Sequence, residues 1–337
     1  MKKKNLLIVA FSVLAISLFA KSNDIKPTKD VLDKVLDSVV PLESSYNGSV
    51  GYNGDYVLFG IWPQSKKANN VSVDTSNANF INGWNCYKGS DDCFYVKTKT
   101  KPYDEYKFDD GSDIEASKDY FFLLEPIVWR VVDNNYESGK LLVSEKILSS
   151  GSFCTSTNDR KDALNNYEKS SIRAWLNGLN GNSYDVENFT GKGFINKAFS
   201  DNGINNIKTV NVDNSASSTG YSGSDLKKVK KYACKNTNDK IFLLSGSEVT
   251  NDKYGFGSTK ENDLSRTRKT TDYARATVAY SNSDTKYMNN GWWWLRSPNS
   301  RMDNVALGVR YDGVSNANYT ISHDRKAGGI VPSLVIK

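Results

Sequence analysis

The sequence predicts an α+β fold with mixed or antiparallel sheets, a few short helices and long loops. Short runs rich in Val, Ile, Leu and aromatic residues have strand character, and a few amphipathic runs have helical periodicity. Polar segments rich in Asn, Ser, Gly and Asp separate these runs. Aromatic residues make up 12% of the 337 residues, which favours a compact fold with an aromatic core over disorder.

The N-terminus predicts a secretory signal peptide over residues 1–20. Three lysines at positions 2–4 precede an apolar stretch from Leu6 to Phe19, and Ala20 is a small residue suited to cleavage. The stretch is too short to cross a bilayer comfortably, no cysteine follows for lipid attachment, and no later segment is apolar enough to span a membrane. We therefore expect an exported protein located in the periplasm, at the cell surface or outside the cell.

The net charge excludes one class of partner. The formal charge of the whole chain is +6, and removal of the three signal-peptide lysines leaves +3. This value is too small to indicate nucleic acid, which usually requires a concentrated basic face.

The mature chain divides into a short leading segment and one domain. Residues 21–50 are expected to form a helix over 27–40, with apolar residues at three- and four-residue steps, and then a turn-rich linker. This helix either docks on the main domain or leads to a partner. Residues 51–337 form the single domain, with a strand at 56–62 and a polar insertion at about 65–117.

The middle of the chain alternates between strands and helices. Serines before residues 172–178 and Thr271 or Asp272 are expected as helix N-caps. The expected strands are 126–133, 140–148 and 240–245, and the expected helices are 170–179, 193–201 and 270–280.

The C-terminal part is predicted to contain strands and turns. Its expected strands are 290–298, 304–314 and 328–337, and Asp312-Gly313 is a strong hairpin signal. In the run GWWWLRSP, strand alternation places Trp292, Trp294 and Arg296 on one face and Trp293, Leu295 and Ser297 on the other. Both faces are largely apolar, so we expect a central core strand built on Trp293, Trp294 and Arg296, with Trp292 at its edge.

Arg296 needs a partner if it is buried, because an unpaired internal guanidinium is costly. Glu125, Glu145 and Glu248 are the candidate acids, each next to an expected strand or turn. The structural interpretation is an internal arginine that fixes strand geometry, and the functional one is an anion clamp.

Four cysteines suggest disulfides in an exported protein. A short polar loop separates Cys86 from Cys93, so we expect the pairs Cys86–Cys93 and Cys154–Cys234. A zinc site is the weaker alternative because the chain has no CxxC motif and a single histidine, His323.

The sequence contains no recognisable catalytic constellation, and we expect no cofactor. His323 lies in a polar loop, and the acids are scattered through loops. Asp109, Asp110 and Asp113 could bind calcium, but the loop lacks the full EF-hand spacing, so a solvated acidic loop is the default interpretation.

A series of motifs resembles a known family. In order, these are FGIWPQ, EPIVWRVVD, LLVSEKIL, NNYEKSSIRAWLNG, GFINKAFS, DKIFLLSGSEVT, WWWLRSPN and GGIVPSLVI. The series is similar to a widespread family of bacterial exported domains of unknown function, marked by FGxYPQ, PIxWxVL, SxIRxWLN, WWLRSP and GVRPAL. The chain departs from this pattern at Trp62, where the family usually has tyrosine, and at Val331, where it usually has arginine. Any role of that arginine is therefore absent here or moved.

The tail of that family resembles the C-type-lectin-like fold, which sulfatase-modifying proteins share. This resemblance implies a fold and carries no function. The sulfatase-modifying proteins use cysteine chemistry near the C-terminus, and this chain has no cysteine after Cys234.

We expect an exported, non-catalytic binding domain that presents variable loops on a rigid aromatic core, since binding residues concentrate on such loops. The ligand would be a glycan, a peptide or a host protein. The alternatives are an envelope enzyme acting on glycan or cell-wall material, and a structural envelope component that associates through the 27–40 helix. The oligomeric state stays open. The ligand-binding candidates are Asn299, Arg301, Asp303, Tyr311, Tyr319 and His323.

Overall fold

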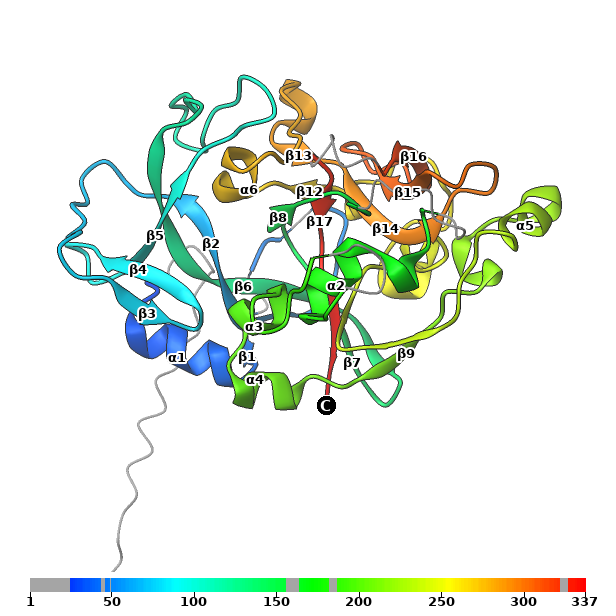
Figure 1. Cartoon of the computed structure of the whole chain (residues 1–337), viewed down its shortest axis with the longest axis horizontal. Helices are drawn as coiled ribbons and strands as arrows, with labels where there is room; N and C mark the ends of the chain where they lie inside the picture. Colours follow the sequence, from blue (N-terminus) through cyan, green and yellow to red (C-terminus); the bar gives the residue numbers. More distant parts are fainter. Residues whose placement is uncertain (1–24, 44–45, 49, 156–163, 182–186, 322–326) are drawn as a thin grey trace, which may run out of the picture.

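The computed structural model describes residues 25–43, 46–48, 50–155, 164–181, 187–321 and 327–337. The expected signal peptide and His323 lie outside these residues. The described chain is a sheet-rich α+β structure with short helices, which confirms the fold class at this level (Figure 1). No helix in the described ranges is long and apolar enough to cross a membrane.

The larger sheet is organised around one long strand, β6, which spans Asp119–Tyr136. Trp129 and Arg130 pair with β2 on one side and with β7 on the other, and Phe122 pairs with both β2 and β5. The strand β2 therefore follows one edge of β6, while β5 and β7 share the opposite edge. The sheet order is β11 (Ile241–Phe242), β18 (Ser333–Ile336), β7 (Gly139–Ser144), β6, β5 (Phe94–Lys99), β4 (Trp84–Lys88) and β3 (Asn79–Ile81), with β2 (Tyr56–Lys66) and β1 (Val40–Pro41) beside β6.

Local turn chemistry explains the hairpin that joins β6 to β7. Glu137 and Ser138 have φ values of 48° and 60° between the paired residues Tyr136 and Gly139. Left-handed conformations at both central residues are typical of a type I′ turn, whose twist matches that of the strands. This turn joins the strands expected at 126–133 and 140–148, which pair in antiparallel fashion.

A bulge in β2 requires the glycine of the FGIWPQ motif. Gly60 has a φ of +71° where the pairing register of β2 with β6 shifts. A Cβ atom at this position would lie 2.5 Å from the ring of Phe199 and 2.7 Å from the carbonyl of Ala198. Only glycine meets both conditions without displacing its neighbours.

A second sheet contains the tryptophan-rich strand. Its order is β16 (Ala317–Thr320), β15 (Val305–Val309), β14 (Trp293–Pro298), β17 (Gly329–Ile330) and β8 (Ser149–Ser150). Figure 1 shows β14, β15 and β16 on one side of the molecule and the β3–β5 strands, which belong to the expected insertion at 65–117, on the other.

Two chain segments pass from one sheet to the other. Residues 329–336, expected as one strand, form β17 in the second sheet and β18 in the larger one, interrupted at Pro332, which lacks the N–H that a continuous ladder needs. The segment from β7 to β8 makes the same transition. β7 pairs with β18 in the larger sheet, and β8 pairs with β17 in the second sheet. This paired crossing joins the two sheets.

The alternation expected for β14 divides the core into two parts. Trp293 and Leu295 pack in a cluster with Phe242 and Val143, whereas Trp294 packs in the main cluster with Trp129. Trp293, Trp294 and Leu295 each have an exposed fraction of 0%. The strand therefore separates two apolar regions.

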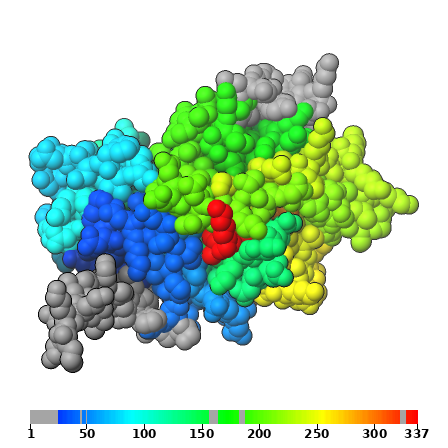
Figure 2. All heavy atoms as spheres, turned by 90° about the horizontal axis from the view of Figure 1, so that it is seen from below, coloured from blue at the N-terminus to red at the C-terminus, as the bar shows by residue number. Residues whose placement is uncertain are grey.

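The N-terminal helix belongs to the main body. Leu32, Val35 and Leu36 are buried, and α1 contacts β2 and α4. Figure 2 shows the C-terminus (red) on the same face, between the N-terminal segment (blue) and residues around 200 (green), where Lys337 N donates to Asn206 O. The helices are α1 (Lys29–Asp37), α2 (Ser171–Asn177), α3 (Phe194–Ala198), α4 (Asp201–Asn206), α5 (Gly223–Val229) and α6 (Asp272–Ala276).

Side-chain caps fix two of the expected helices. Ser170 Oγ accepts from the N–H of Arg173 at the start of α2, and Thr271 Oγ1 accepts from Ala274 at the start of α6. Two small ladders and six 3₁₀ turns complete the described structure. They are β9 (Val210–Val212), β10 (Thr237–Asp239), β12 (Arg268–Lys269), β13 (Asn290–Gly291), η2 (Tyr167–Lys169), η4 (Ala216–Thr219), η5 (Glu248–Thr250), η6 (Asp252–Tyr254), η7 (Leu264–Arg266) and η8 (Thr285–Tyr287).

The cysteines form no disulfide in the described structure, where all four are free thiols. Cys86 lies opposite Val96 in the β4–β5 ladder, three residues beyond Cys93, which is about 10 Å along a strand. Cys86 faces the main core, and Cys93 faces a separate cluster, so the expected Cys86–Cys93 bridge is wrong for this geometry. Cys154 and Cys234 both contact the main core as unbonded thiols, and burial raises the pKa of Cys234.

Arg296 is held inside the fold by one of the expected acids. Its side chain is 2% exposed and pairs with both carboxylate oxygens of Glu248, with Nη2 3.0 Å from Oε1. It also donates to the carbonyls of Leu243, at 2.7 Å, and Asp213, at 3.1 Å. Glu145 pairs instead with Arg130. The contacts of Arg296 are therefore those of an internal structural arginine.

We predict that Arg296→Leu lowers the free energy of unfolding by about 3 kcal/mol, because it leaves the Glu248 carboxylate, whose side chain is only 12% exposed, without its cation. Denaturant unfolding would measure this loss. Arg301→Leu is the matched control, since this side chain is 67% exposed and should change stability little. Equal effects of the two substitutions would contradict the assigned role.

Candidate functional site

A pocket lined mainly by aromatic rings lies against the second sheet. Its volume is about 280 Å³. We call it the aromatic pocket, and its lining residues are Tyr103, Tyr280, Trp292, Arg310, Tyr311, Tyr319, Thr320 and Ala327.

One wall of the aromatic pocket is a stacked pair of rings. Trp292 and Tyr319 lie 3.7 Å apart between ring centroids, with an interplanar angle of 8°. The edge of Trp292 also packs against Trp294, whose ring is 4.8 Å away and nearly perpendicular. The buried Trp294 thus supports the half-buried platform in front of it.

Two glycines make room for this platform. A Cβ at Gly308 of β15 would come within 2.8 Å of the Tyr319 ring. A Cβ at Gly328 would come within 2.7 Å of Trp292 and 2.1 Å of Trp294. A larger residue at either position would displace the rings, so both glycines are needed for the wall in this form.

The pocket lining also contains tyrosines from distant parts of the chain. Tyr280 lies 6.2 Å from Tyr103 of the 65–117 segment and 6.2 Å from Tyr311 of the β15–β16 loop. The ring of Tyr287 also packs against that of Tyr311, with 5.8 Å between their centroids. The pocket therefore exists only in the folded chain.

Among the described residues that line the pocket, Arg310 carries the charge. Arg310 Nε donates to Asp312 Oδ1 at 2.8 Å, and this ion pair raises the pKa of Arg310 and lowers that of Asp312. Burial raises the pKa of Tyr319, so its hydroxyl stays neutral at physiological pH. The pocket thus offers neutral hydroxyls, π faces and one guanidinium.

The structure separates the residues expected to bind a ligand. Tyr311 and Tyr319 line the aromatic pocket. Asn299 is buried and accepts from the N–H groups of Arg301 and Met302, which is a turn-capping role. Arg301 and Asp303 are exposed and do not line the pocket, and His323 is outside the described residues.

The remaining lining residues were not expected from the sequence as ligand-binding groups. Trp292 was expected at the edge of its strand, but Tyr280, Tyr103 and Arg310 carried no expectation. The signal that could have found them is an aromatic residue within a polar segment, such as Tyr103 in KPYDEY. It does not indicate which loops meet.

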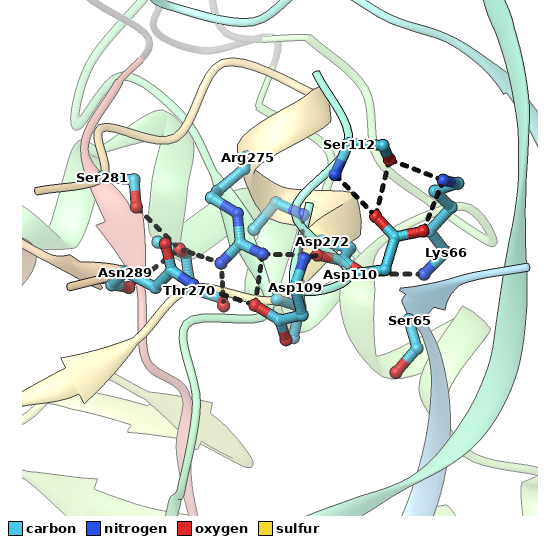
Figure 3. Close-up of polar contacts among 12 residues, drawn as sticks. Ser65, Lys66, Asp109, Asp110, Ser112, Thr270, Asp272, Arg275, Ser281 and Asn289 are labelled. Atoms are coloured by element: carbon cyan, nitrogen blue, oxygen red, sulfur yellow. Dashed lines mark hydrogen bonds and ion pairs between the residues drawn. The ribbon is translucent and has the colours of Figure 1, made fainter. Parts of the chain in front are cut away.

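The acidic loop considered for calcium is paired with basic side chains (Figure 3). Asp109 Oδ1 lies 2.6 Å from Arg275 and Asp110 Oδ2 lies 2.7 Å from Lys66. Asp113 lies 2.6 Å from Lys107. Each carboxylate would have to leave its cation to bind calcium, and no group of three or more His, Cys, Asp or Glu side chains that could hold a metal occurs in the described part of the chain.

These contacts fasten the 65–117 segment to α6. Asp272 accepts from the backbone N–H of Lys66 at 2.9 Å and of Asp109 at 2.8 Å, and it also pairs with Arg275. Burial raises the pKa of Asp272, and the neighbouring Arg275 opposes that shift. The network in Figure 3 thus joins the end of β2, the acidic loop and α6.

With its two sheets and aromatic pocket, the protein is an α+β protein with a pocket of small-ligand size. A family model described as a domain of unknown function, DUF6273, matches residues 137–337. This match covers more than half of the chain, so the protein belongs to that family. The match includes Tyr280, Trp292, Tyr311 and Tyr319 of the pocket, whereas Tyr103 lies before it. No curated protein and no solved structure matches the chain.

We predict a pH-dependent contribution from the Lys66–Asp110 pair. Hydrogen bonds from Lys66 and Ser112 lower the pKa of Asp110 to about 2, below its value in the unfolded chain. The stabilisation is therefore full above about pH 4 and is lost as the pH falls towards about 2. Asp110→Asn should cost less than about 1 kcal/mol at pH 7, because the carboxylate is partly exposed.

Denaturant unfolding at pH 7 and at about pH 2 would measure the contribution of the Lys66–Asp110 pair to the free energy of unfolding. Asp113→Asn is the exposed control. The difference between the wild type and Asp110→Asn should shrink at the lower pH. A difference that stays constant with pH would contradict the assigned ion pair.

Proposed function

We propose that this protein is an exported, non-catalytic domain that binds glycan through the aromatic pocket. The observation that carries the proposal is the platform formed by Trp292 and Tyr319, which lines one pocket together with three further tyrosines. Small-ligand sites combine such apolar surfaces with a few placed polar groups.

The chemistry of the pocket suits a sugar ring. The C–H groups on one face of a pyranose carry partial positive charge and pack on the electron-rich face of an aromatic ring. Tyrosine hydroxyls and the Arg310 guanidinium can hydrogen-bond to sugar hydroxyls. A cationic ligand, which aromatic cages otherwise favour, would find no carboxylate among the described lining residues.

The pocket lining favours binding over catalysis. None of the described residues that line it is Asp, Glu, His or Cys, so these residues offer no carboxylate pair for glycoside cleavage. An envelope enzyme remains the second candidate function. The structural-component alternative is disfavoured, because the apolar face of α1 that it would use for self-association is packed against β2 and α4.

We also propose that the second sheet has a C-type-lectin-like arrangement and that the protein acts outside the cytoplasm. The order of the tryptophan-rich β14, the β15–β16 hairpin and the β17–β18 segment supports the first point. The apolar N-terminal stretch supports the second.

A glycan array followed by titration of any hit tests the proposed function. We expect Trp292→Ala to weaken glycan binding by at least about tenfold, because one face of the platform is lost. Tyr311→Ala, which leaves the stacked pair intact, should weaken binding by a smaller factor.

Phe80→Ala is the matched control, since Phe80 is 75% exposed in β3 and does not line the pocket. It should bind glycan like the wild type. Unchanged affinity in both pocket variants, or binding of peptides in place of glycans, would overturn the proposal.

A further inference from the structure

A second cleft shares no lining residue with the aromatic pocket and has a different chemistry. Its volume is about 300 Å³. We call it the lysine cleft, and its lining includes Trp62, Trp84, Trp175, Ser149, Ser150 and Lys197.

Three tryptophans form a rigid wall of the lysine cleft. Trp62 meets Trp84 at 5.0 Å and Trp175 at 6.0 Å between centroids, both edge to face. The indole of Trp62 donates to Leu148 O at 2.9 Å, and that of Trp84 donates to Lys197 O at 3.2 Å. Hydrogen bonds and ring contacts thus fix this wall before any ligand enters.

Lys197 is a cation without an acid in this cleft. Its Nζ lies 4.4 Å from the ring centroid of Trp84, and no carboxylate of the described residues pairs with it. Burial lowers the pKa of Lys197. The described residues that line the cleft include no Asp or Glu, so an incoming anion would meet no carboxylate among them. Lys192, at the rim, is already paired with Glu187 at 2.8 Å.

Hydroxyl groups from β8 and α2 line the rest of the cleft. Ser150 donates to Thr277 O at 3.1 Å, and the hydroxyls of Thr155 and Ser171 lie 2.7 Å apart. Ser149 lines the cleft and its side chain has no hydrogen bond to another described residue. Such hydroxyls can donate to or accept from the polar substituents of a ligand.

We propose that the lysine cleft binds an anionic monosaccharide unit, with the carboxylate or phosphate on Lys197 and the sugar ring against the tryptophans. An anion would pair with the ammonium in a partly desolvated site, where the attraction is stronger than in water. The indoles give the ring an apolar surface, and the hydroxyls bond its substituents. This site is independent of the glycan-binding function proposed for the aromatic pocket.

Three probes that share one ring test the proposal by isothermal titration. Glucuronate and glucose 6-phosphate carry a carboxylate and a phosphate, and glucose carries neither. We expect at least one anionic sugar to bind at least about tenfold more tightly than glucose, with an affinity that falls as salt rises. The comparison of the two anions identifies which group the cleft prefers.

Substitutions locate the binding. Lys197→Met should reduce the affinity for the anionic sugar at least about tenfold, and Lys197→Arg should retain much of it. Lys99→Met removes an exposed lysine of β5 that does not line the cleft and should change nothing. Trp292→Ala should leave this binding unchanged, which separates the result from a failure of the aromatic pocket.

Equal affinity for glucose and the anions, or unchanged affinity in Lys197→Met, would overturn the proposal. The absence of binding by either anion at millimolar concentration would overturn it as well. An unfolding transition would show whether Lys197→Met folds. If it does not, the affinities of the wild type for the three probes still test the proposal.

Discussion

Buried arginines that donate to backbone carbonyls stabilise the irregular parts of this fold. Residues 245–290 contain only short helical turns and two-residue strands, so most of their carbonyls have no ladder partner. Arg266 is 0% exposed, and its hydrogen bonds take the place of the missing ladder bonds. Its guanidinium donates to the carbonyls of Gly313, Val249, Gly257, Thr259 and Glu261. A planar guanidinium with five N–H donors can hydrogen-bond to several loop segments at once, which a lysine ammonium could not do.

The aromatic pocket depends on this arrangement. The bond from Arg266 to Gly313, 2.7 Å long, fixes the loop that carries Tyr311. The backbone carbonyl of Arg266 in turn accepts from the indole of Trp293 at 3.2 Å. Arg266 therefore connects the core strand β14 to the loop that carries Tyr311. A binding surface made of loops can be rigid when its loops are fixed in this way, and a rigid surface loses less entropy when it binds.

Features that depend on local sequence could be predicted, and those that depend on distant partners could not. The alternation of Trp293 and Trp294 followed from strand geometry alone, and the caps at Ser170 and Thr271 followed from side-chain chemistry. In contrast, Tyr103 and Tyr280 are far apart in sequence and meet only because the 65–117 segment is fastened to α6. The change of sheet at Pro332 was also missed, since a proline inside an apolar run does not reveal which strands lie on either side.

The paired crossing between the sheets has a consequence for how the chain folds. β18 lies between β7 and β11, and β17 lies between β14 and β8, so residues 329–336 occupy interior positions in both sheets. Until these residues arrive, β7 and β14 each present an unpaired edge to solvent. Contacts of such large sequence separation form slowly, and open edges invite aggregation in the meantime. The two sheets must therefore stay incompletely formed in the nascent polypeptide until residues 329–336 have been synthesised, an interval in which chaperones can protect it.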